Sequence, residues 1–298
     1  MDVVLACSKA QVLGQRIAKQ FSAELVEYET RKFSDGEIYS RILGNVNNKE
    51  VIIVQAGYPE PNDALIELFL VVDACRSLNS RRIRVVMPYF PYARQDKRFN
   101  RGESLSLHVI ADLLKSMGVS LVVTADAHFK EDYGSYDFFG IKSYNISGGT
   151  VIAEHIKEKF KLDDFVIISP DLGSRGMIDE ASKNVGAKTM KIDKKRKSET
   201  EVEMTANDLD VKGKDVLIID DIISTGGTML KAIELMKKAG ANRVFAGATH
   251  GIFSKNSFKK LEKATNYLVT TDSIQTGVME VTLAGEIMKV IEDSRVYF

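Results

Sequence analysis

One stretch of the sequence joins an apolar run, two adjacent carboxylates and a glycine-containing turn. It reads Val216-Leu217-Ile218-Ile219-Asp220-Asp221-Ile222-Ile223-Ser224-Thr225-Gly226-Gly227-Thr228. The run 216–219 predicts a buried strand, and in open α/β sheets ligands bind where such strands end. The turn then opens a helix, and the backbone N–H groups at a helix start suit a phosphate. The stretch therefore predicts an α/β sheet with an anion site at one edge.

A simple strand–turn–helix connection, capped by Asp221 or Ser224, is the structural alternative for these residues. A cap needs one such residue, whereas two adjacent carboxylates repel each other. We therefore interpret Asp220 and Asp221 as acceptors for a ribose diol. Ser224, Thr225 and Thr228 then supply hydroxyl donors beside the two glycines.

Short β-branched runs alternate with helix-period patterns along the rest of the chain. Strands are predicted at 3–6, 51–55, 83–87, 119–124, 165–169, 188–192, 244–249 and 267–270. This alternation is typical of an α/β fold, with a mainly parallel sheet flanked by helices. Because the order of elements restarts near 143–149, we predict two similar domains, 1–145 and 146–281. A terminal helix is predicted within 282–298, and the first domain is a candidate surface for it to pack against.

Composition narrows the classes of function. The 298 residues hold 41 Lys plus Arg and 41 Asp plus Glu, a balance that argues against a broad nucleic-acid surface. No apolar run approaches the roughly 18 residues of a membrane helix, and the first residues lack the basic region of a signal peptide. Cys7 and Cys75 have no metal-ligand spacing, so we expect buried thiols in a reducing compartment. We expect a soluble cytoplasmic protein without nucleic-acid or membrane partners.

Two long stretches break the α/β pattern. Residues 94–102 are polar and basic between a predicted strand and a helix, and residues 194–210 open with four basic residues and show no clear period. Loops of this length inside compact domains are often functional.

The stretch 216–228 resembles the ribose-5-phosphate motif of the phosphoribosyltransferase superfamily, which includes phosphoribosyltransferases and ribose-phosphate pyrophosphokinases. Two further segments separate these classes. Phe33-Ser34-Asp35-Gly36-Glu37 is by itself a hairpin turn signal, and Arg94-Gln95-Asp96 is by itself a solvated loop. Together, ahead of the ribose motif, they resemble the ribose-phosphate pyrophosphokinases.

This resemblance implies a set of residue roles. ATP would be bound by Phe33, Asp35, Gly36, Glu37, Arg94, Gln95 and Asp96, with the adenine contacts reaching in from a neighbouring subunit. Ribose 5-phosphate would be bound by Arg196, Asp220, Asp221, Ser224, Thr225, Gly226, Gly227 and Thr228. Lys194, Arg196 and His128 would be catalytic, and His128 and Asp171 would bind Mg²⁺.

Three of these roles have structural alternatives. His128 follows a predicted strand, where a single histidine is commonly a satisfied structural residue. Asp171, in Ser169-Pro170-Asp171-Leu172-Gly173-Ser174-Arg175-Gly176, resembles the family's pyrophosphate loop but is also a plausible helix cap. Lys194 and Arg196 belong to a basic run, which by itself predicts a solvated face.

The chain departs from the usual family pattern at 129–136, at Ser174-Arg175-Gly176 and at Ser224, where bacterial members typically have Asp. Ser224 resembles archaeal-type sequences. The implied reaction transfers the β,γ-diphosphoryl group of ATP to the C1 hydroxyl of ribose 5-phosphate, giving phosphoribosyl diphosphate and AMP. The implied assembly is a dimer-based homo-oligomer, with a tetramer or hexamer as larger candidates. A nucleobase phosphoribosyltransferase and a non-catalytic regulatory homologue are the alternative functions.

Overall fold

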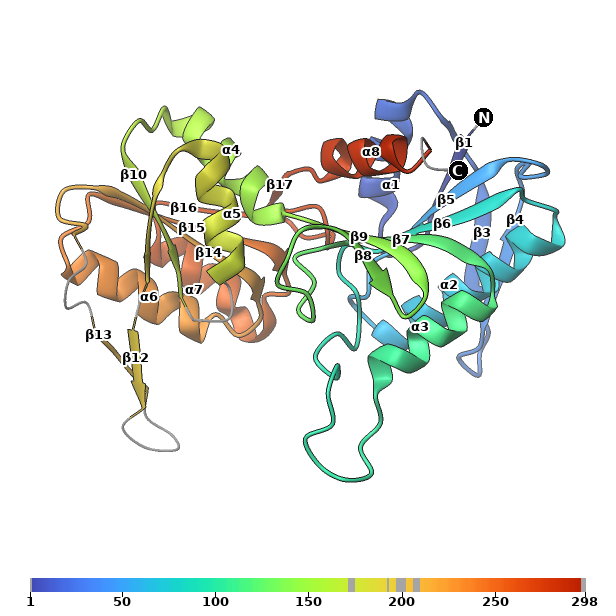
Figure 1. Cartoon of the computed structure of the whole chain (residues 1–298), viewed down its shortest axis with the longest axis horizontal. Coiled ribbons are helices and arrows are strands. Elements are labelled where there is room, and N and C mark those ends of the chain that lie inside the picture. Colours follow the sequence, from blue (N-terminus) through green and yellow to red (C-terminus); the bar gives the residue numbers. More distant parts are fainter. Residues whose placement is uncertain (1, 171–174, 192, 197–201, 206–209, 296–298) are drawn as a thin grey trace. The chain divides into compact units, whose positions relative to one another are not determined.

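The structure, a computed structural model, describes residues 2–170, 175–191, 193–196, 202–205 and 210–295. The chain forms two compact units. The first comprises Met1–Ile146, Ser273–Gln275 and Thr282–Phe298, and the second comprises Ser147–Asp272 and Thr276–Val281. Each unit is built on its own sheet (Figure 1). In the part of the chain that is described, no helix is long and apolar enough to cross a bilayer.

The sheet of the first unit is parallel except at one edge. Its strands run in the order β2 (Glu24–Leu25), β1 (Asp2–Ala6), β5 (Glu50–Val54), β6 (Arg82–Val86), β7 (Val119–Ala125), β9 (Ile141–Ile146) and β8 (Gly134–Phe138). Only β8 among these is antiparallel to its neighbour. This agrees with the predicted mainly parallel sheet.

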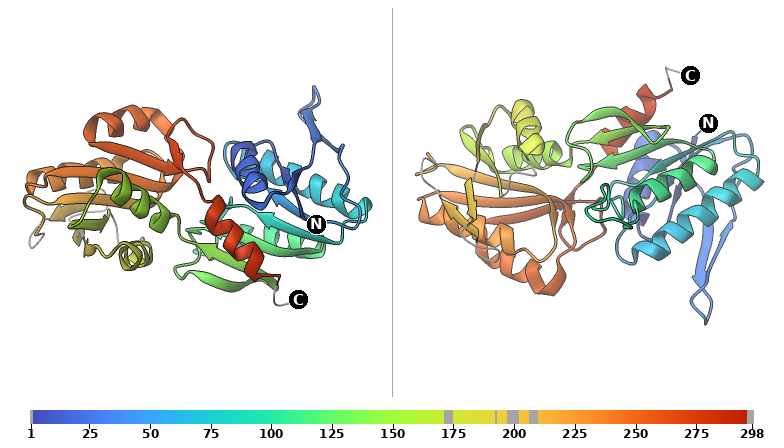
Figure 2. Two further views of the ribbon diagram at one scale, coloured as in Figure 1. Left: turned by 90° about the horizontal axis from the view of Figure 1, so that it is seen from above. Right: turned by 60° about the horizontal axis from the view of Figure 1, so that its bottom comes forward.

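Helices cover both faces of this sheet. They are α1 (Gln11–Phe21), α2 (Pro61–Ser77), α3 (Ser106–Ser116) and α8 (Ala284–Asp293). Helices α1 and α8 lie on one face, and α2 and α3 lie on the other (Figures 1 and 2). Helix α8 packs on α1, and Arg295 just beyond it forms an ion pair with Asp2 at the start of β1.

A separate hairpin, β3 (Tyr28–Lys32) and β4 (Ile38–Ile42), stands off from this sheet as an arm (blue in Figure 2). Its strands are antiparallel and pair Lys32 with Ile38. The turn expected at Asp35-Gly36 is confirmed, and Gly36 has a φ of 96°, which favours glycine.

The second unit has a fully parallel main sheet. The strand order is β11 (Lys188–Lys191), β10 (Phe165–Ser169), β14 (Asp215–Ile223), β15 (Arg243–Gly251), β16 (Tyr267–Thr271) and β17 (Met279–Val281). The helices are α4 (Gly148–Phe160), α5 (Arg175–Val185), α6 (Gly227–Lys238) and α7 (Ser257–Ala264), with a 3-10 turn η1 (Ser254–Asn256). The buried residues of α6, such as Met229, Ile233 and Met236, recur at helical spacing and pack against β14 and β15.

The expectation of an irregular loop over 194–210 is wrong in part. Strand β12 (Asp193–Arg196) pairs antiparallel with β13 (Val202–Thr205), so these segments form a second hairpin. Its register places Arg196 opposite Val202. Lys194, Lys195 and Arg196 of the basic run therefore belong to a strand rather than to an irregular loop.

The two units repeat one order of elements. The strands β2-β1-β5-β6-β7 of the first unit correspond to β11-β10-β14-β15-β16 of the second, and all these pairs are parallel. The hairpin β3–β4 precedes β5 as β12–β13 precedes β14. The five residues 33–37 separate the strands of the first hairpin, and the five residues 197–201 those of the second. This correspondence supports the prediction of two similar domains.

Candidate active site

The paired carboxylates lie inside β14. The sequence predicted a strand over 216–219 with both carboxylates beyond its end, but β14 runs from Asp215 to Ile223. The strand is longer because it pairs with β15 up to Ile223 opposite Gly251, whereas it pairs with β10 only up to Ile218. Asp220 and Asp221 therefore occupy the part of β14 that extends past its β10 pairing.

Backbone amides orient both carboxylates. The N–H of Asp221 donates to Asp220 Oδ1 at 3.1 Å, and the N–H of Ile222 donates to Asp221 Oδ1 at 2.8 Å. Asp220 is buried and Asp221 is half-buried. Two fixed carboxylates at a sheet edge provide acceptors for a pair of neighbouring hydroxyl groups.

The turn after β14 is held by a hydrogen bond on one side and is exposed to solvent on the other. Ser257 Oγ donates to the carbonyl oxygen of Ser224 at 2.9 Å, while Thr225, Gly227 and Thr228 are exposed. Gly226 has a φ of 74° and precedes α6; within the described structure no side-chain hydrogen bond caps this position. The start of α6 thus presents backbone N–H groups and hydroxyls, as an anion site requires.

The other predicted residues of the second unit are only partly described. Strand β10, next to β14, ends at Ser169, and Asp171 lies outside the described residues. Lys194 and Arg196 both lie on β12.

In the first unit, two predicted segments leave the same edge of the sheet. Arg94 and Gln95 follow β6, and His128 follows the neighbouring β7; all three residues are exposed. Ser106 Oγ donates to Gln95 Oε1 at 2.5 Å, which ties the loop to α3. Asp96 is half-buried in the same loop.

The later part of this loop is braced by Glu103. Its carboxylate accepts from the N–H groups of Phe99, at 2.7 Å, and Asn100, at 3.0 Å. The side chain and backbone of Asn100, and then the Phe99 amide, hold the pKa of Glu103 below its usual value. These hydrogen bonds give the polar loop a defined conformation.

The hairpin tip is a third predicted segment. Phe33 is 42% exposed and meets Tyr39 edge-on at 6.1 Å between ring centroids. The Arg31 guanidinium lies 4.5 Å from the Phe33 ring centroid. Asp35, Gly36 and Glu37 are also exposed. The tip presents an aromatic ring beside carboxylates.

The cysteines have the predicted character. Cys7 and Cys75 are free thiols and fully buried. Burial raises the pKa of Cys75 to about 12 and also raises that of Cys7. Neither thiol is poised for metal binding or nucleophilic attack at neutral pH. The described residues also contain no cluster of three or more His, Cys, Asp or Glu side chains that suits a metal ion.

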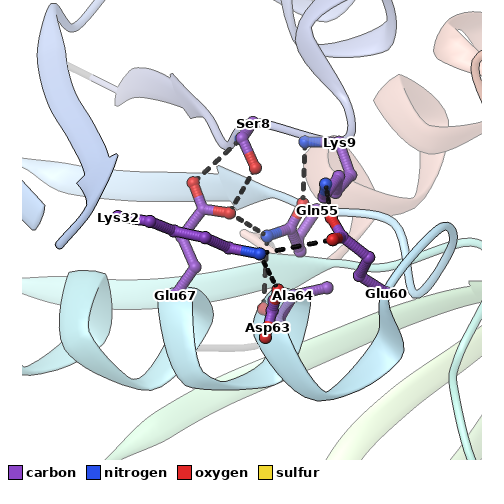
Figure 3. Close-up of polar contacts among 8 residues, drawn as sticks. All are labelled: Ser8, Lys9, Lys32, Gln55, Glu60, Asp63, Ala64 and Glu67. Carbon is purple, nitrogen blue, oxygen red and sulfur yellow. Dashed lines mark hydrogen bonds and ion pairs between the residues drawn. The ribbon is translucent and has the colours of Figure 1, made fainter. Parts of the chain in front are cut away.

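The sequence did not single out a polar cluster at the start of α2, shown in Figure 3. It contains Glu67, a carboxylate that is only 3% exposed because it lies among the apolar residues on the buried side of α2. A carboxylate at a position on the apolar face of a predicted helix was the sequence signal that could have indicated this buried polar cluster. Lys32, beside the predicted hairpin turn, was the second missed residue.

Comparison with known proteins agrees with this arrangement. Residues 3–118 match the N-terminal domain of ribose phosphate pyrophosphokinase, and residues 141–283 match the phosphoribosyl transferase domain. The two units thus define an α/β protein of the phosphoribosyltransferase type.

Full-length relatives identify the group within this class. A ribose-phosphate pyrophosphokinase of Methanothermobacter thermautotrophicus is 35% identical over 292 residues, covering 98% of this chain and 100% of the relative. One from Vibrio cholerae is 39% identical over 265 residues, covering 88% and 83%. The crystal structure of phosphoribosylpyrophosphate synthetase from Mycobacterium smegmatis has a TM-score of 0.84 at 26% identity, covering 100% of this chain and 99% of that chain. The chain belongs to the ribose-phosphate pyrophosphokinase family.

Proposed function

We propose that this protein transfers the β,γ-diphosphoryl group of ATP to the C1 hydroxyl of ribose 5-phosphate. The C1 oxygen attacks the β-phosphorus, the bond from that phosphorus to the oxygen of the α-phosphate breaks, and AMP leaves. The hydroxyl proton is released, and phosphoribosyl diphosphate is formed. The observation that carries this proposal is the ordered carboxylate pair of β14 followed by the open turn before α6, in a chain whose two halves match the family.

The second unit holds the sugar phosphate in this proposal. Asp220 and Asp221 accept hydrogen bonds from the ribose diol, because their own carboxylates are already oriented by backbone amides. The 5-phosphate is bound by the turn of Ser224, Thr225, Gly226, Gly227 and Thr228, together with Arg196. Exposed N–H groups and hydroxyls at a helix start support this role.

The first unit holds ATP. Arg94, Gln95 and Asp96 contact the nucleotide from the loop after β6. Phe33, Asp35, Gly36 and Glu37 contact the adenine of a neighbouring subunit, which requires a dimer-based homo-oligomer. The exposed aromatic ring at the hairpin tip supports this assignment. A solution mass equal to a monomer at assay concentration would refute the shared site.

Mg²⁺ is the metal that fits these residues. The described residues lack a dedicated cluster of protein ligands, and Mg²⁺ is commonly held by one or two side chains plus substrate phosphates and waters. We assign His128 and Asp171 as those side chains. When bound, Mg²⁺ would offset the negative charge of the transferred diphosphate.

Phosphoryl transfer needs positioning and positive charge more than covalent chemistry. Lys194 and Arg196 supply that charge from the β12–β13 hairpin. His128 acts from the edge of the first sheet as a catalytic contact to the phosphates.

A product assay tests the proposal. ATP, Mg²⁺ and ribose 5-phosphate should yield AMP and phosphoribosyl diphosphate in equal amounts. ADP as the nucleotide product would contradict diphosphoryl transfer. Release of diphosphate from phosphoribosyl diphosphate and a nucleobase, without ATP, would instead support the phosphoribosyltransferase alternative. Nucleotide binding without turnover would support the regulatory one.

A further inference from the structure

The arm formed by β3 and β4 is fastened to α2 at two levels. Near its base, the Tyr28 hydroxyl donates to Glu67 Oε1 at 2.5 Å. Near its tip, Lys32 forms ion pairs with Asp63 and, at 3.2 Å, with Glu60 Oε1 (Figure 3). Since the arm belongs to neither main sheet, contacts of this kind hold its direction.

The base contact is fixed within the first unit. Glu67 also accepts from the N–H of Ser8 at 2.9 Å, from Ser8 Oγ at 2.5 Å and from Gln55 Nε2 at 2.9 Å. Gln55 directly follows the inner strand β5, and Ser8 lies two residues after the end of the inner strand β1. A buried carboxylate with this many donors has little freedom to move. It ties the base of the arm to the sheet.

The tip contact is the more exposed one and lies next to the proposed adenine site. Lys32 is the last residue of β3, so it directly precedes Phe33. Its partner Glu60 is held in turn by Lys9, whose Nζ lies 2.7 Å from Glu60 Oε2. Hydrogen bonds to Asp63 and then Glu60 raise the pKa of Lys32 further above neutrality.

The connection between β5 and α2 can be compared with the equivalent connection in the second unit. Strand β5 and α2 correspond to β14 and α6, so the connection carrying Glu60 corresponds to the turn proposed to bind a phosphate. Likewise Lys32 ends β3 as Arg196 ends β12. In the first unit, two carboxylates at the start of α2, Glu60 before the helix and Asp63 in its first turn, pair with the cation that ends β3. These ion pairs connect the end of β3 to the start of α2.

We propose that Lys32, held by Asp63 and Glu60, is a positioning residue that orients the hairpin tip for adenine. This inference rests on the proposed function, because it concerns the ATP site of that reaction. Preorganising a binding segment improves affinity by reducing the ordering cost on binding. Loss of the contact should therefore weaken ATP binding and leave the ribose 5-phosphate site intact.

The test compares Lys32→Met, Asp63→Asn and the conservative Lys32→Arg. We expect Lys32→Met to raise KM for ATP by about threefold to tenfold, the range for an exposed ion pair or two, with KM for ribose 5-phosphate unchanged. Asp63→Asn should give a smaller rise in the same direction, and Lys32→Arg should restore the original value. The matched control is Lys49→Met, which removes a 2.7 Å ion pair outside the arm with Glu24, a carboxylate about as exposed as Glu60. It should leave both KM values unchanged.

A second readout does not depend on turnover. The sequence contains no tryptophan, so Phe33→Trp provides a single reporter at the tip. In that background, Lys32→Met should lower the fluorescence anisotropy of the indole, and Lys49→Met should not. Unchanged anisotropy would overturn the positioning role whatever the kinetics. Lower anisotropy with an unchanged KM for ATP would overturn its link to ATP. If the starting protein forms no AMP, the proposed function fails, while the anisotropy still decides whether Lys32 orders the tip.

Discussion

Replacing Gly226 by alanine tests the geometry of the turn that opens α6. Gly226 has a φ of 74°, where a Cβ costs about 1–2 kcal/mol. The added Cβ would also lie 3.0 Å from Ser257 Cβ and 3.1 Å from Leu261 Cδ1, and crowding of this kind typically costs about 1–3 kcal/mol. The two effects sum to about 2–5 kcal/mol. A unit of this size should then unfold on the order of 10 °C lower.

Two other glycines separate these effects. Gly213 has the same φ of 74° but, among the described residues, no atom within 4 Å of its added Cβ, so Gly213→Ala should cost about 1–2 kcal/mol. At Gly227 an added Cβ would meet only Thr225 Oγ1 at 4.0 Å within the described structure. Because alanine favours a helix more than glycine does, Gly227→Ala should unfold at or slightly above the original temperature.

Thermal unfolding followed by circular dichroism ranks the three variants, and the KM for ribose 5-phosphate follows the turn itself. Gly226→Ala should be the least stable and should raise that KM, because relief of the crowding moves the backbone of the proposed phosphate turn. Equal destabilisation by Gly226→Ala and Gly213→Ala would refute the close approach of Ser257 and Leu261. Equal destabilisation by Gly226→Ala and Gly227→Ala would refute the backbone argument.

Three further outcomes are expected. Lys194→Ala should reduce kcat by about 10³-fold while calorimetric binding of ribose 5-phosphate persists, and unchanged turnover would reject its catalytic role. Glu67→Ala should destabilise the first unit by about 3 kcal/mol or more in urea unfolding, because it leaves several buried donors without an acceptor. Tyr28→Phe removes only one of these hydrogen bonds and should destabilise the unit less. The Arg243 guanidinium, bonded to Asp215 at 2.6 and 3.0 Å, holds the pKa of Asp215 below its ordinary value of 3.8. The stabilisation of the fold by this ion pair is therefore fully present above pH 3.8 and is lost as the pH falls through the lower pKa of folded Asp215. Asp215→Asn should accordingly flatten the acid limb of a profile of unfolding free energy against pH.

Hydrophobic pattern was enough to predict the inner strands. The run 165–169 coincides with β10, and the prediction 3–6 lies within β1, since buried parallel strands are apolar along their whole length. The full extent of β14 was not predictable in this way. Asp220 and Asp221 interrupt its apolar pattern, and backbone pairing with β15 carries the strand past them.

The hairpin β12–β13 shows the same limit more strongly. Its basic residues show no apolar alternation, and the backbone ladder defines it instead. In the candidate site, residues 220–228 could be predicted together because they are contiguous. The contact of Lys32 with Asp63 joins residues 31 positions apart, so it depends on how the arm packs on α2. A single sequence carries no local signal for such a pair.

The place of α8 in the first unit has a consequence for how the chain folds as it is synthesised. Helix α8 buries Ala284, Ile287 and Ile291 and packs on α1, yet the whole of the second unit lies between Ile146 and Ala284 in the chain. At about 5–20 residues per second, translation of those intervening residues takes on the order of 10–30 s. For that time the nascent first unit exposes the apolar surface of α1 that α8 later covers. The half of the polypeptide that leaves the ribosome first is therefore the half that completes its core last.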